Sequence, residues 1–522
     1  MSRRALIIGI DGLDMDLVNR WFHVEAISEA PAQPIKGSDL PNLSRLIFGG
    51  ARAKLRSVTP LNSAAAWTSF LTARNPGGHG IFGFTRTHHD GYHRSTARCD
   101  DIGAATIWEM ANSSGAPVGL INCPMTYPPP KLDGFVISGI PIPYNQVWAY
   151  PPEVEASLRD KFGPYSVDLP WWDLGDGTPG RREAFIADMY RMARKREEVT
   201  LWSMRARPWR ILAVIFTGTD RLLHSFWHLS DPSHPSHDKA GAAAHGREIR
   251  RYFILLDEII GRILAEAGEE TPVILMSDHG FGPLHYRFHL RRWLENHNYL
   301  KYLPKDDPSY NDESLDDCLR GVDWRNTYAY PASLSESGIW INKAGRQANG
   351  IVSGDREEEI TERLLVELSE AAPNGHHPIE RVYRREEVIS GQYLEEAPDL
   401  LIKPRDTYIV DDAASEAEIS PSARETATHR TFGIFAASGP GLRKGADLGE
   451  LSIVDVLPTA LAAAGIPIPE NIEGIPAMKA FESPPRLIES KIVMPSRARR
   501  SLPMPDQEEK AMKDQLKGIG YL

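Results

Sequence analysis

The most constraining feature of this sequence is a short apolar run that ends in a carboxylate and an imidazole. Residues Val273–Met276 form the run, and Asp278, His279 and Gly280 follow it after one serine. An uninterrupted apolar stretch of this length is typical of a strand buried on both faces of a parallel sheet. Open α/β sheets bind their ligands at the carboxyl ends of such strands. We therefore expect Asp278 and His279 to converge on one ion; a helix-capping Asp followed by an exposed His is the alternative.

Two further apolar runs end in the same way. Residues 5–10 lead into Asp11-Gly12, and residues 211–216 lead into a segment that carries Asp220 and His224. Asp220 and His224 are four residues apart, so on a helical turn they face the same way and can bind one ion. For Asp11, the Asp-Gly pair is also a common turn sequence.

A fourth polar group precedes a helical pattern. Residues 64–73 have helical spacing of apolar groups, and Ser63 stands at the expected N-cap position. A hydroxyl there lies among free backbone N–H groups at the positive end of the helix dipole. Ser63 is therefore interpreted either as a structural cap or as a nucleophile whose bound phosphate the helix amides would hold.

The order of the predicted elements indicates an α/β fold with a doubly wound, mostly parallel sheet sandwiched by helices. We expect the core to comprise residues 1–284 and 400–481, with a long irregular excursion at about 141–180. Residues 285–399 are interpreted as an inserted α+β cap, and residues 482–522 as a C-terminal tail. A strand over 399–403 is expected to return to the main sheet, and His429 is expected on a loop before a strand at 433–437.

Together, these strand-end groups form two mixed oxygen and nitrogen ligand sets at one edge of the sheet, enough for a pair of divalent metal ions. The groups are Asp11, Ser63, Asp220, His224, Asp278, His279 and His429.

Composition excludes some classes of function. The 522 residues carry a net charge of −11, so there is no surplus of Lys and Arg for non-specific nucleic-acid binding. No apolar run approaches the length of a membrane span. The three cysteines, Cys99, Cys123 and Cys318, are far apart and odd in number, which favours reduced thiols. We therefore expect a cytoplasmic protein; the sequence leaves its oligomeric state open.

Five motifs carry these groups in a fixed order along the chain. They are I-I-G-I-D-G at 7–12, S-A-A-A-W-T-S-F-L-T-A-R-N-P-G-G-H-G-I at 63–81, F-T-G-T-D-R-L-L-H at 216–224, S-D-H-G-F-G-P at 277–283 and T-H-R-T-F-G-I-F-A-A-S-G-P-G-L at 428–442. As a set they resemble the alkaline phosphatase superfamily, in its type I phosphodiesterase/nucleotide pyrophosphatase branch of predicted phosphohydrolases and phosphomutases. The resemblance extends over roughly residues 4 to 480.

The resemblance implies which residues bind which ion. It assigns one metal to Asp220, His224 and His429, and a second to Asp11, Asp278 and His279, with the oxygen of Ser63 completing the second set. It also implies that Ser63 is the nucleophile and forms a phosphoserine intermediate. Zn²⁺ is the expected metal, with Mn²⁺ as the alternative.

Two departures from the family pattern bear on the substrate. The nucleotide pyrophosphatases have an Asn three residues after the nucleophile that helps to hold phosphate, and this chain has Ala66 there. Asn62 or backbone amides are expected to contact phosphate instead. The Cys/Ser-x-Pro-x-Arg signature of the formylglycine sulfatases is absent around Ser63, which excludes that branch.

The sequence thus predicts a two-metal phosphohydrolase that acts on a small-molecule phosphate ester. Diesters are expected to be preferred over monoesters, because the motifs bring in no cationic side chain clearly aimed at the site for the extra monoester charge. The nearest are Arg74, Arg221 and Arg430. A phosphomutase of the cofactor-independent type and a non-catalytic binding protein that retains a metal site are the alternatives.

Overall fold

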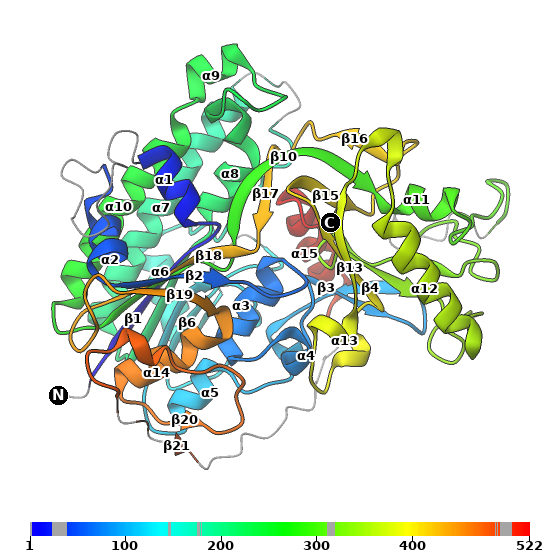
Figure 1. The fold of residues 1–522 in the computed structure, drawn as a ribbon. Helices are drawn as coiled ribbons and strands as arrows, with labels where there is room; N and C mark the ends of the chain where they lie inside the picture. The colour runs from blue at the N-terminus through cyan, green and yellow to red at the C-terminus, as the bar shows by residue number, and fades with distance from the viewer. Residues whose placement is uncertain are drawn as a thin grey trace.

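A nine-stranded sheet forms the centre of the molecule in the computed structural model, which describes residues 3–22, 39–144, 148–174, 178, 180–308, 310, 319–485, 487, 489–490 and 504–522 (Figure 1). Its strand order is β19-β2-β18-β9-β1-β8-β5-β6-β7. The strands, in that order, are Asp447–Ser452, Ala51–Arg56, Phe432–Ser438, Val273–Met276, Ala5–Ile10, Ile211–Phe216, Val118–Cys123, Gly134–Ser138 and Ala149–Tyr150.

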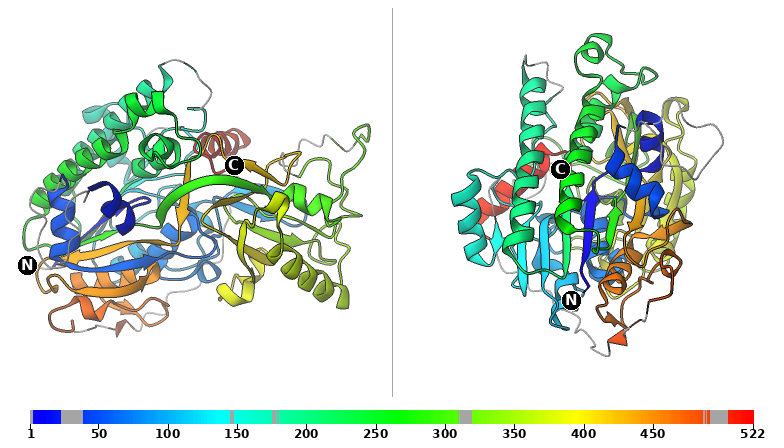
Figure 2. Two further views of the ribbon diagram at one scale, coloured as in Figure 1. Left: turned by 45° about the horizontal axis from the view of Figure 1, so that its top comes forward. Right: turned by 90° about the vertical axis from the view of Figure 1, so that its left-hand side faces the viewer.

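Helices cover both faces of this sheet (Figures 1 and 2), because alternate residues of each strand point to opposite faces. On β1, Leu6 and Ile8 belong to one buried cluster, and Ala5 and Ile7 belong to the other. The first face packs on α1 (Met15–Phe22), α2 (Pro41–Gly49), α6 (Pro152–Phe162), α7 (Arg181–Ala206), α8 (Gly218–Ser230) and α10 (Glu248–Ala267). The second face packs on α3 (Ser63–Thr72), α5 (Ile107–Asn112) and α14 (Val456–Ala464). The predicted doubly wound α/β fold is confirmed.

The strand order explains why distant parts of the sequence meet. β9, β1 and β8 are adjacent and parallel, with Gly9 opposite Met276 and Ile10 opposite Phe216. Their carboxyl ends therefore lie at one edge of the sheet. β18 is antiparallel to β9, so its first residues begin at that same edge.

A second assembly of sheets follows β9 in the chain. β10 (Gly280–His289) pairs with β15 (Thr407–Asp411), β16 (Ile419–Pro421) and β17 (Ala427–Arg430), and a separate sheet has the order β11-β12-β14-β13. The strands of that separate sheet are Ala329–Pro331, Gly338–Ile341, Leu400–Pro404 and Ile379–Arg384. Three helices accompany these sheets: α11 (Leu290–Asn296), α12 (Asp355–Ser369) and α13 (Arg385–Val388).

The strand predicted at 399–403 exists as β14, but its expected return to the main sheet is wrong. β14 pairs with β12 and β13 in the cap sheet, so the predicted cap boundary at residue 399 divides that sheet. A short apolar run indicates a strand, but it does not specify which distant strand will be its partner.

The segment at 141–180 is also more regular than expected. Helix α6 begins with Pro152 in its first turn and is followed by Gly163, as is common for helix ends. The chain also adds the short edge strand β7 there.

The C-terminal helix α15 (Asp506–Gly518) is part of the core rather than a separate tail. It matches the helical pattern expected near 507–517, and its side chains Met512 and Leu516 are buried in the cluster on the first face of the main sheet. Figure 1 shows this helix in red, next to the region where the core meets the cap sheets.

The remaining elements are short. They are α4 (Pro76–His79), β3 (Thr85–His88), β4 (His93–Thr96), α9 (Lys239–His245), β20 (Ile468–Pro469) and β21 (Glu489–Ser490). Cys99 and Cys123 are free and buried, whereas Cys318 lies outside the described residues. Within the part of the chain that the structure describes, no helix combines the length and the apolar character that crossing a membrane requires.

Candidate metal centre and nucleophile

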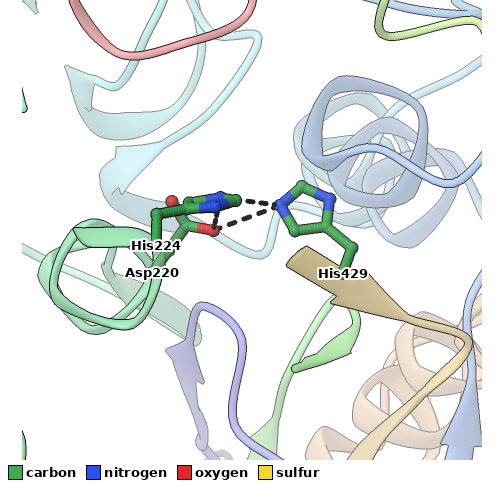
Figure 3. Close-up of side chains that lie close together, drawn as sticks. All are labelled: Asp220, His224 and His429. Atoms are coloured by element: carbon green, nitrogen blue, oxygen red, sulfur yellow. Dashed lines mark hydrogen bonds and ion pairs between the residues drawn. The ribbon is translucent and has the colours of Figure 1, made fainter. Parts of the chain in front are cut away.

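Asp220, His224 and His429 form a compact group, here named the first cluster (Figure 3). The Nε2 atom of His224 lies 3.2 Å from Oδ2 of Asp220 and 3.2 Å from Nε2 of His429. Oδ2 of Asp220 and Nε2 of His429 are 3.3 Å apart. Tetrahedral zinc with ligands at about 2.0–2.2 Å separates its ligand atoms by roughly 3.3–3.5 Å. The three atoms are therefore already spaced as ligands of one ion.

The elements that carry the first cluster were predicted with one error. Asp220 and His224 lie one turn apart on α8, as expected. His429 lies on the short strand β17 and not on a loop, because residues 427–430 pair with the first residues of β10. His429 pairs with Phe281 of β10, and Phe281 is two residues after His279 in the chain. This pairing fixes the backbone of His429 close to His279.

A second layer of contacts orients His224. Its Nδ1 atom lies 2.8 Å from the carbonyl oxygen of Ala427 and 2.9 Å from Oε1 of Glu425, and its ring stacks on Trp171 at 4.9 Å between centroids. Both oxygens are acceptors, so Nδ1 of His224 carries a hydrogen and faces them. The opposite nitrogen of the ring, Nε2, therefore faces the first cluster. Metal-binding histidines commonly have such a carbonyl or carboxylate partner. Sequence reasoning missed Glu425, whose position has no recognisable spacing to His224.

The second cluster consists of Asp11, Asp278, His279 and the hydroxyl of Ser63. The Nε2 atom of His279 lies 3.4 Å from Oδ1 of Asp11, 3.2 Å from Oδ2 of Asp278 and 3.2 Å from Oγ of Ser63. The Nδ1 atom of His279 lies 3.1 Å from the carbonyl oxygen of Gly280, so Nε2 presents its lone pair to the cluster.

Three carboxylate oxygens of the second cluster have no protein donor. Among the described residues, Oδ1 of Asp11 and both carboxylate oxygens of Asp278 are buried without a hydrogen-bond partner. Buried polar atoms are normally satisfied, so each such atom requires an explanation. Two anionic carboxylates and an imidazole lone pair around one point are a ligand set for a divalent cation.

Asp220 belongs to both clusters. Ligand atoms of Asp11, Asp220 and His279 also lie within 4.8 Å of one another. The family resemblance assigns Asp220 to the first ion alone, and that assignment stays a prediction. The order β9-β1-β8 places the residues after all three strands side by side, so Asp220 also lies next to the second cluster. The structure brings all seven predicted ligand residues to this one edge.

Ser63 is the first residue of α3, and the prediction that it caps the helix is wrong. Asn62 is the N-cap, and its side chain accepts a hydrogen bond of 2.9 Å from the backbone N–H of Ala65. The Asn62 amide also donates to the carbonyl oxygens of Phe82 and Ser335, each at 2.8 Å. A phosphate contact from Asn62 stays a prediction. The Ser63 hydroxyl does not cap the helix and lies next to His279 of the second cluster.

A residue that sequence reasoning missed is next to Ser63. The hydroxyl of Tyr521, from the segment after α15, lies 2.9 Å from Oγ of Ser63. Its ring is 4.4 Å from that of Phe84, between centroids, and Tyr521 is only 6 % exposed. The local sequence G-I-G-Y-L carries no catalytic signature that would indicate this position.

The clusters differ in charge balance. Burial opposes ionisation of Asp220, but His224 and Arg221 hold the pKa of Asp220 well below its usual value. Arg221 is itself fixed by two hydrogen bonds to Asp168, of 3.0 and 2.8 Å. In the second cluster, burial and the charge of Asp278 raise the pKa of Asp11 well above its usual value. Burial and the charge of Asp220 raise the pKa of Asp278 to about 7.

A cavity of about 890 Å³ leads to this edge of the sheet from between the core and the cap. Its lining includes His224, His429, Asn62 and Tyr521 from the core side, and Ile402, Lys403, Tyr408 and Ile409 from β14 and β15. A volume of this size is suited to a small molecule.

The arginines near the motifs are already engaged. Arg430 lines the cavity, but it donates to the carbonyl oxygen of Pro283 at 2.7 Å and pairs with Asp406 at 3.2 Å. Arg221 lies behind Asp220 with Asp168, and Arg74 is 3.8 Å from Glu473.

Comparisons with known proteins bear on what this site does. A family model described as type I phosphodiesterase / nucleotide pyrophosphatase matches residues 5–433, which confirms the resemblance drawn from the motifs. A search of curated proteins gives no match.

Two solved structures of murine ectonucleotide pyrophosphatase / phosphodiesterase 5 are similar in outline. One is an inactive variant in complex with AMP, at 13% identity and TM-score 0.48, covering 90% of this chain and 97% of that chain. The other has 12% identity and TM-score 0.47, covering 90% and 98%. The family model, and not these distant likenesses, bears on function.

Proposed function

The chain belongs to the type I phosphodiesterase / nucleotide pyrophosphatase family, and from this premise we propose that it hydrolyses phosphodiester bonds of small molecules with Ser63 as its nucleophile. One observation carries the proposal. Oγ of Ser63 lies 3.2 Å from Nε2 of His279, in a second cluster whose ligand atoms adjoin the first cluster through Asp220. A hydroxyl beside two adjoining cation sites is the arrangement that a covalent phosphoryl-transfer mechanism requires.

The donor atoms fit two divalent cations. The first cluster offers two imidazole nitrogens and one carboxylate, and the second offers one imidazole, two carboxylates and the Ser63 hydroxyl. Mixed nitrogen and oxygen sets of this kind suit Zn²⁺, and Mn²⁺ is the alternative. When bound, such ions would lower the pKa of a coordinated hydroxyl and offset the negative charge of the phosphoryl oxygens.

The residues of the chain then have distinct roles. Oγ of Ser63 forms a bond to phosphorus while the bond from phosphorus to the leaving alcohol oxygen breaks. Because the substrate is a diester, the phosphoserine intermediate keeps the second alcohol group on phosphorus. Water then forms a bond to phosphorus while the bond from phosphorus to Oγ of Ser63 breaks, which releases a phosphate monoester and restores the hydroxyl. Because Ser63 is the first residue of α3, a phosphoryl group on its Oγ would lie at the positive end of that helix, where the Asn62 side chain already binds the N–H of Ala65.

The charge around the site supports diesters as the preferred substrates. A monoester carries one more negative charge than a diester, and a site for it would present an uncommitted cation. The two arginines that directly follow a metal-ligand candidate in the chain, Arg221 and Arg430, are bound to Asp168 and to Asp406 with Pro283, respectively.

The experiment is a comparison of kcat/KM for bis(p-nitrophenyl) phosphate and p-nitrophenyl phosphate, with Zn²⁺, Mn²⁺ or Mg²⁺ added to chelator-treated protein. We expect metal-dependent activity on both, with the diester preferred. A clear preference for the monoester would contradict the proposed substrate class. Full activity in the presence of EDTA would contradict the two-metal mechanism.

A further inference from the structure

The segment that follows α15 enters the site and brings a phenol to the nucleophile. Oγ of Ser63 has two side-chain neighbours within hydrogen-bond distance: Nε2 of His279 at 3.2 Å and the hydroxyl of Tyr521 at 2.9 Å. Residues 63 and 521 are separated by almost the whole chain, so this contact is a product of the tertiary fold.

Many contacts fix the position of this segment. The N–H groups of Trp171 and Trp172 donate to the carbonyl oxygen of Gly518 at 2.9 and 3.1 Å, and the indole of Trp171 donates to that of Ile519 at 3.0 Å. The side chain of Ile519 is buried. Trp171 also stacks on His224, so one side chain contacts both the first cluster and the segment that carries Tyr521.

Gly520 allows the chain to turn at this point. Its φ of +83° lies in the left-handed region. A Cβ atom there would lie 2.7 Å from the ring of Trp171 and 3.1 Å from that of Trp172. Only glycine is compatible with this close approach and this backbone conformation.

Side chains of the core also contact the ring of Tyr521. It packs against Phe84, and the guanidinium carbon of Arg221 lies 5.6 Å from its centroid, a cation–π distance. Arg221 is fixed in turn by Asp168. The hydroxyl is therefore positioned before any substrate arrives.

The hydrogen-bond directions can be assigned around Ser63. Nδ1 of His279 donates to the carbonyl oxygen of Gly280, so Nε2 is an acceptor and the Ser63 hydroxyl donates to it. The lone pairs of Oγ are then free to accept. Either hydroxyl of the Ser63–Tyr521 pair can donate, but when the Ser63 proton is directed at His279, the phenol proton of Tyr521 is the one that can lie between the two oxygens.

We propose that Tyr521 is a catalytic residue whose hydroxyl donates a hydrogen bond to the reacting oxygen of Ser63. This role rests on the proposed function. As Ser63 loses its proton, Oγ becomes a stronger acceptor, and a donor already in place stabilises the developing charge without reorganisation. The segment at 519–522 thereby completes the site rather than merely covering it.

The test is the variant Tyr521→Phe in the full chain, which retains the ring packing and removes only the hydroxyl. Tyr127→Phe is the matched control, because the Tyr127 hydroxyl contacts Glu508 on α15 at 3.3 Å, away from Ser63. Metal content, Tm and steady-state kinetics on bis(p-nitrophenyl) phosphate are measured for all three proteins.

We expect Tyr521→Phe to keep its metal content and to fold, with kcat lowered about 10- to 100-fold and KM little changed. The rate of phosphoserine formation in a single turnover should fall by the same factor. Tyr127→Phe should match the wild type in kcat.

Four results would overturn the role of Tyr521. Wild-type kinetics for Tyr521→Phe would show that its hydroxyl does no catalytic work, and faster turnover would show that it obstructs the site. Equal losses in Tyr521→Phe and Tyr127→Phe would assign the effect to α15 packing. If the wild type itself hydrolyses no phosphate ester, the proposed function fails, and the role of Tyr521 fails with it.

Discussion

The two ligand clusters share Asp220 but differ in how the protein balances their charge. In the first cluster, Asp220 has Arg221 and His224 beside it, and Glu425 pairs with the far side of His224. In the second, three carboxylate oxygens of Asp11 and Asp278 are buried with no hydrogen-bond partner among the described residues. The first cluster is therefore built to persist without an ion, whereas the second requires a cation to offset its charge.

This difference follows from the positions of the cationic side chains in the chain. Arg221 follows Asp220 directly on α8, so the first cluster receives its counter-charge from the same helix. Asp11 and Asp278 each follow a buried strand, and neither has a Lys or Arg next to it in the chain. A buried carboxylate without a partner is costly, and strain of this kind is commonly retained where a ligand relieves it.

The largest effect is expected from the residue that both clusters share. Asp220→Asn should lower turnover on the order of 10³-fold or more and reduce the content of both ions, because it weakens the ligand set of each. Metal analysis and kcat on the diester measure this. The control is Asp257→Asn, another buried carboxylate, which accepts hydrogen bonds from Asn42 and Leu43 far from the site. Loss of only one ion would contradict the shared role.

A smaller effect is expected from the contact behind the first cluster. Glu425→Gln should weaken metal affinity at the first cluster by about 10- to 100-fold and leave the second cluster unchanged, because Glu425 orients His224 without being a ligand. Titration of metal-free protein with Zn²⁺ distinguishes the two sites. A variant that binds both ions as tightly as the wild type would show that the carbonyl oxygen of Ala427 suffices to orient His224.

In metal-free protein, replacing one Asp by Asn should change the free energy of unfolding in opposite directions in the two clusters. At pH 8, Asp278→Asn should raise the free energy of unfolding, on the order of 1–3 kcal/mol, because it removes a buried charge whose pKa is raised. Asp220→Asn should lower the free energy of unfolding by about 3 kcal/mol, because it breaks a buried pairing with Arg221. Denaturant unfolding measures both values. Equal signs would remove the distinction between the clusters.

The smallest expected effect is a change in the free energy of unfolding with pH. Burial and Asp220 raise the pKa of Asp278 from 3.8 to about 7, so between these values the folded metal-free protein holds a proton that the unfolded chain has lost. The free energy of unfolding should therefore fall as pH rises through this window. Asp278→Asn should make the slope shallower. The measurement is the urea midpoint from pH 4.5 to 8 on metal-free protein, and an unchanged slope would contradict the assignment.

The sequence predicted the sheet edge well because its signals are local. An apolar run followed directly by Asp11, or shortly by Asp278 or Asp220, identifies a strand and places its next residues at the edge where ligands bind. The pair Asp220 and His224 needed only helical spacing.

The parts that escaped prediction depend on distant pairing. β14 joins the cap sheet through partners at β12 and β13, which its own residues do not specify. Tyr521 reaches Ser63 only because α15 packs on the core and Gly520 turns the chain. Glu425 acts through the fold of β17 against β10, and no motif marks it.

The central claim is that Ser63 is the nucleophile between two cation sites. The most direct measurement is mass spectrometry of protein that is acid-quenched during turnover of bis(p-nitrophenyl) phosphate, with fragmentation to localise the covalent group in the tryptic peptide of residues 57–74. We predict a p-nitrophenyl phosphoryl group on Ser63 that appears in the presence of metal and is absent after chelation. A protein that turns over the diester while this peptide stays unmodified, and whose Ser63→Ala variant retains near-normal turnover, would contradict the account.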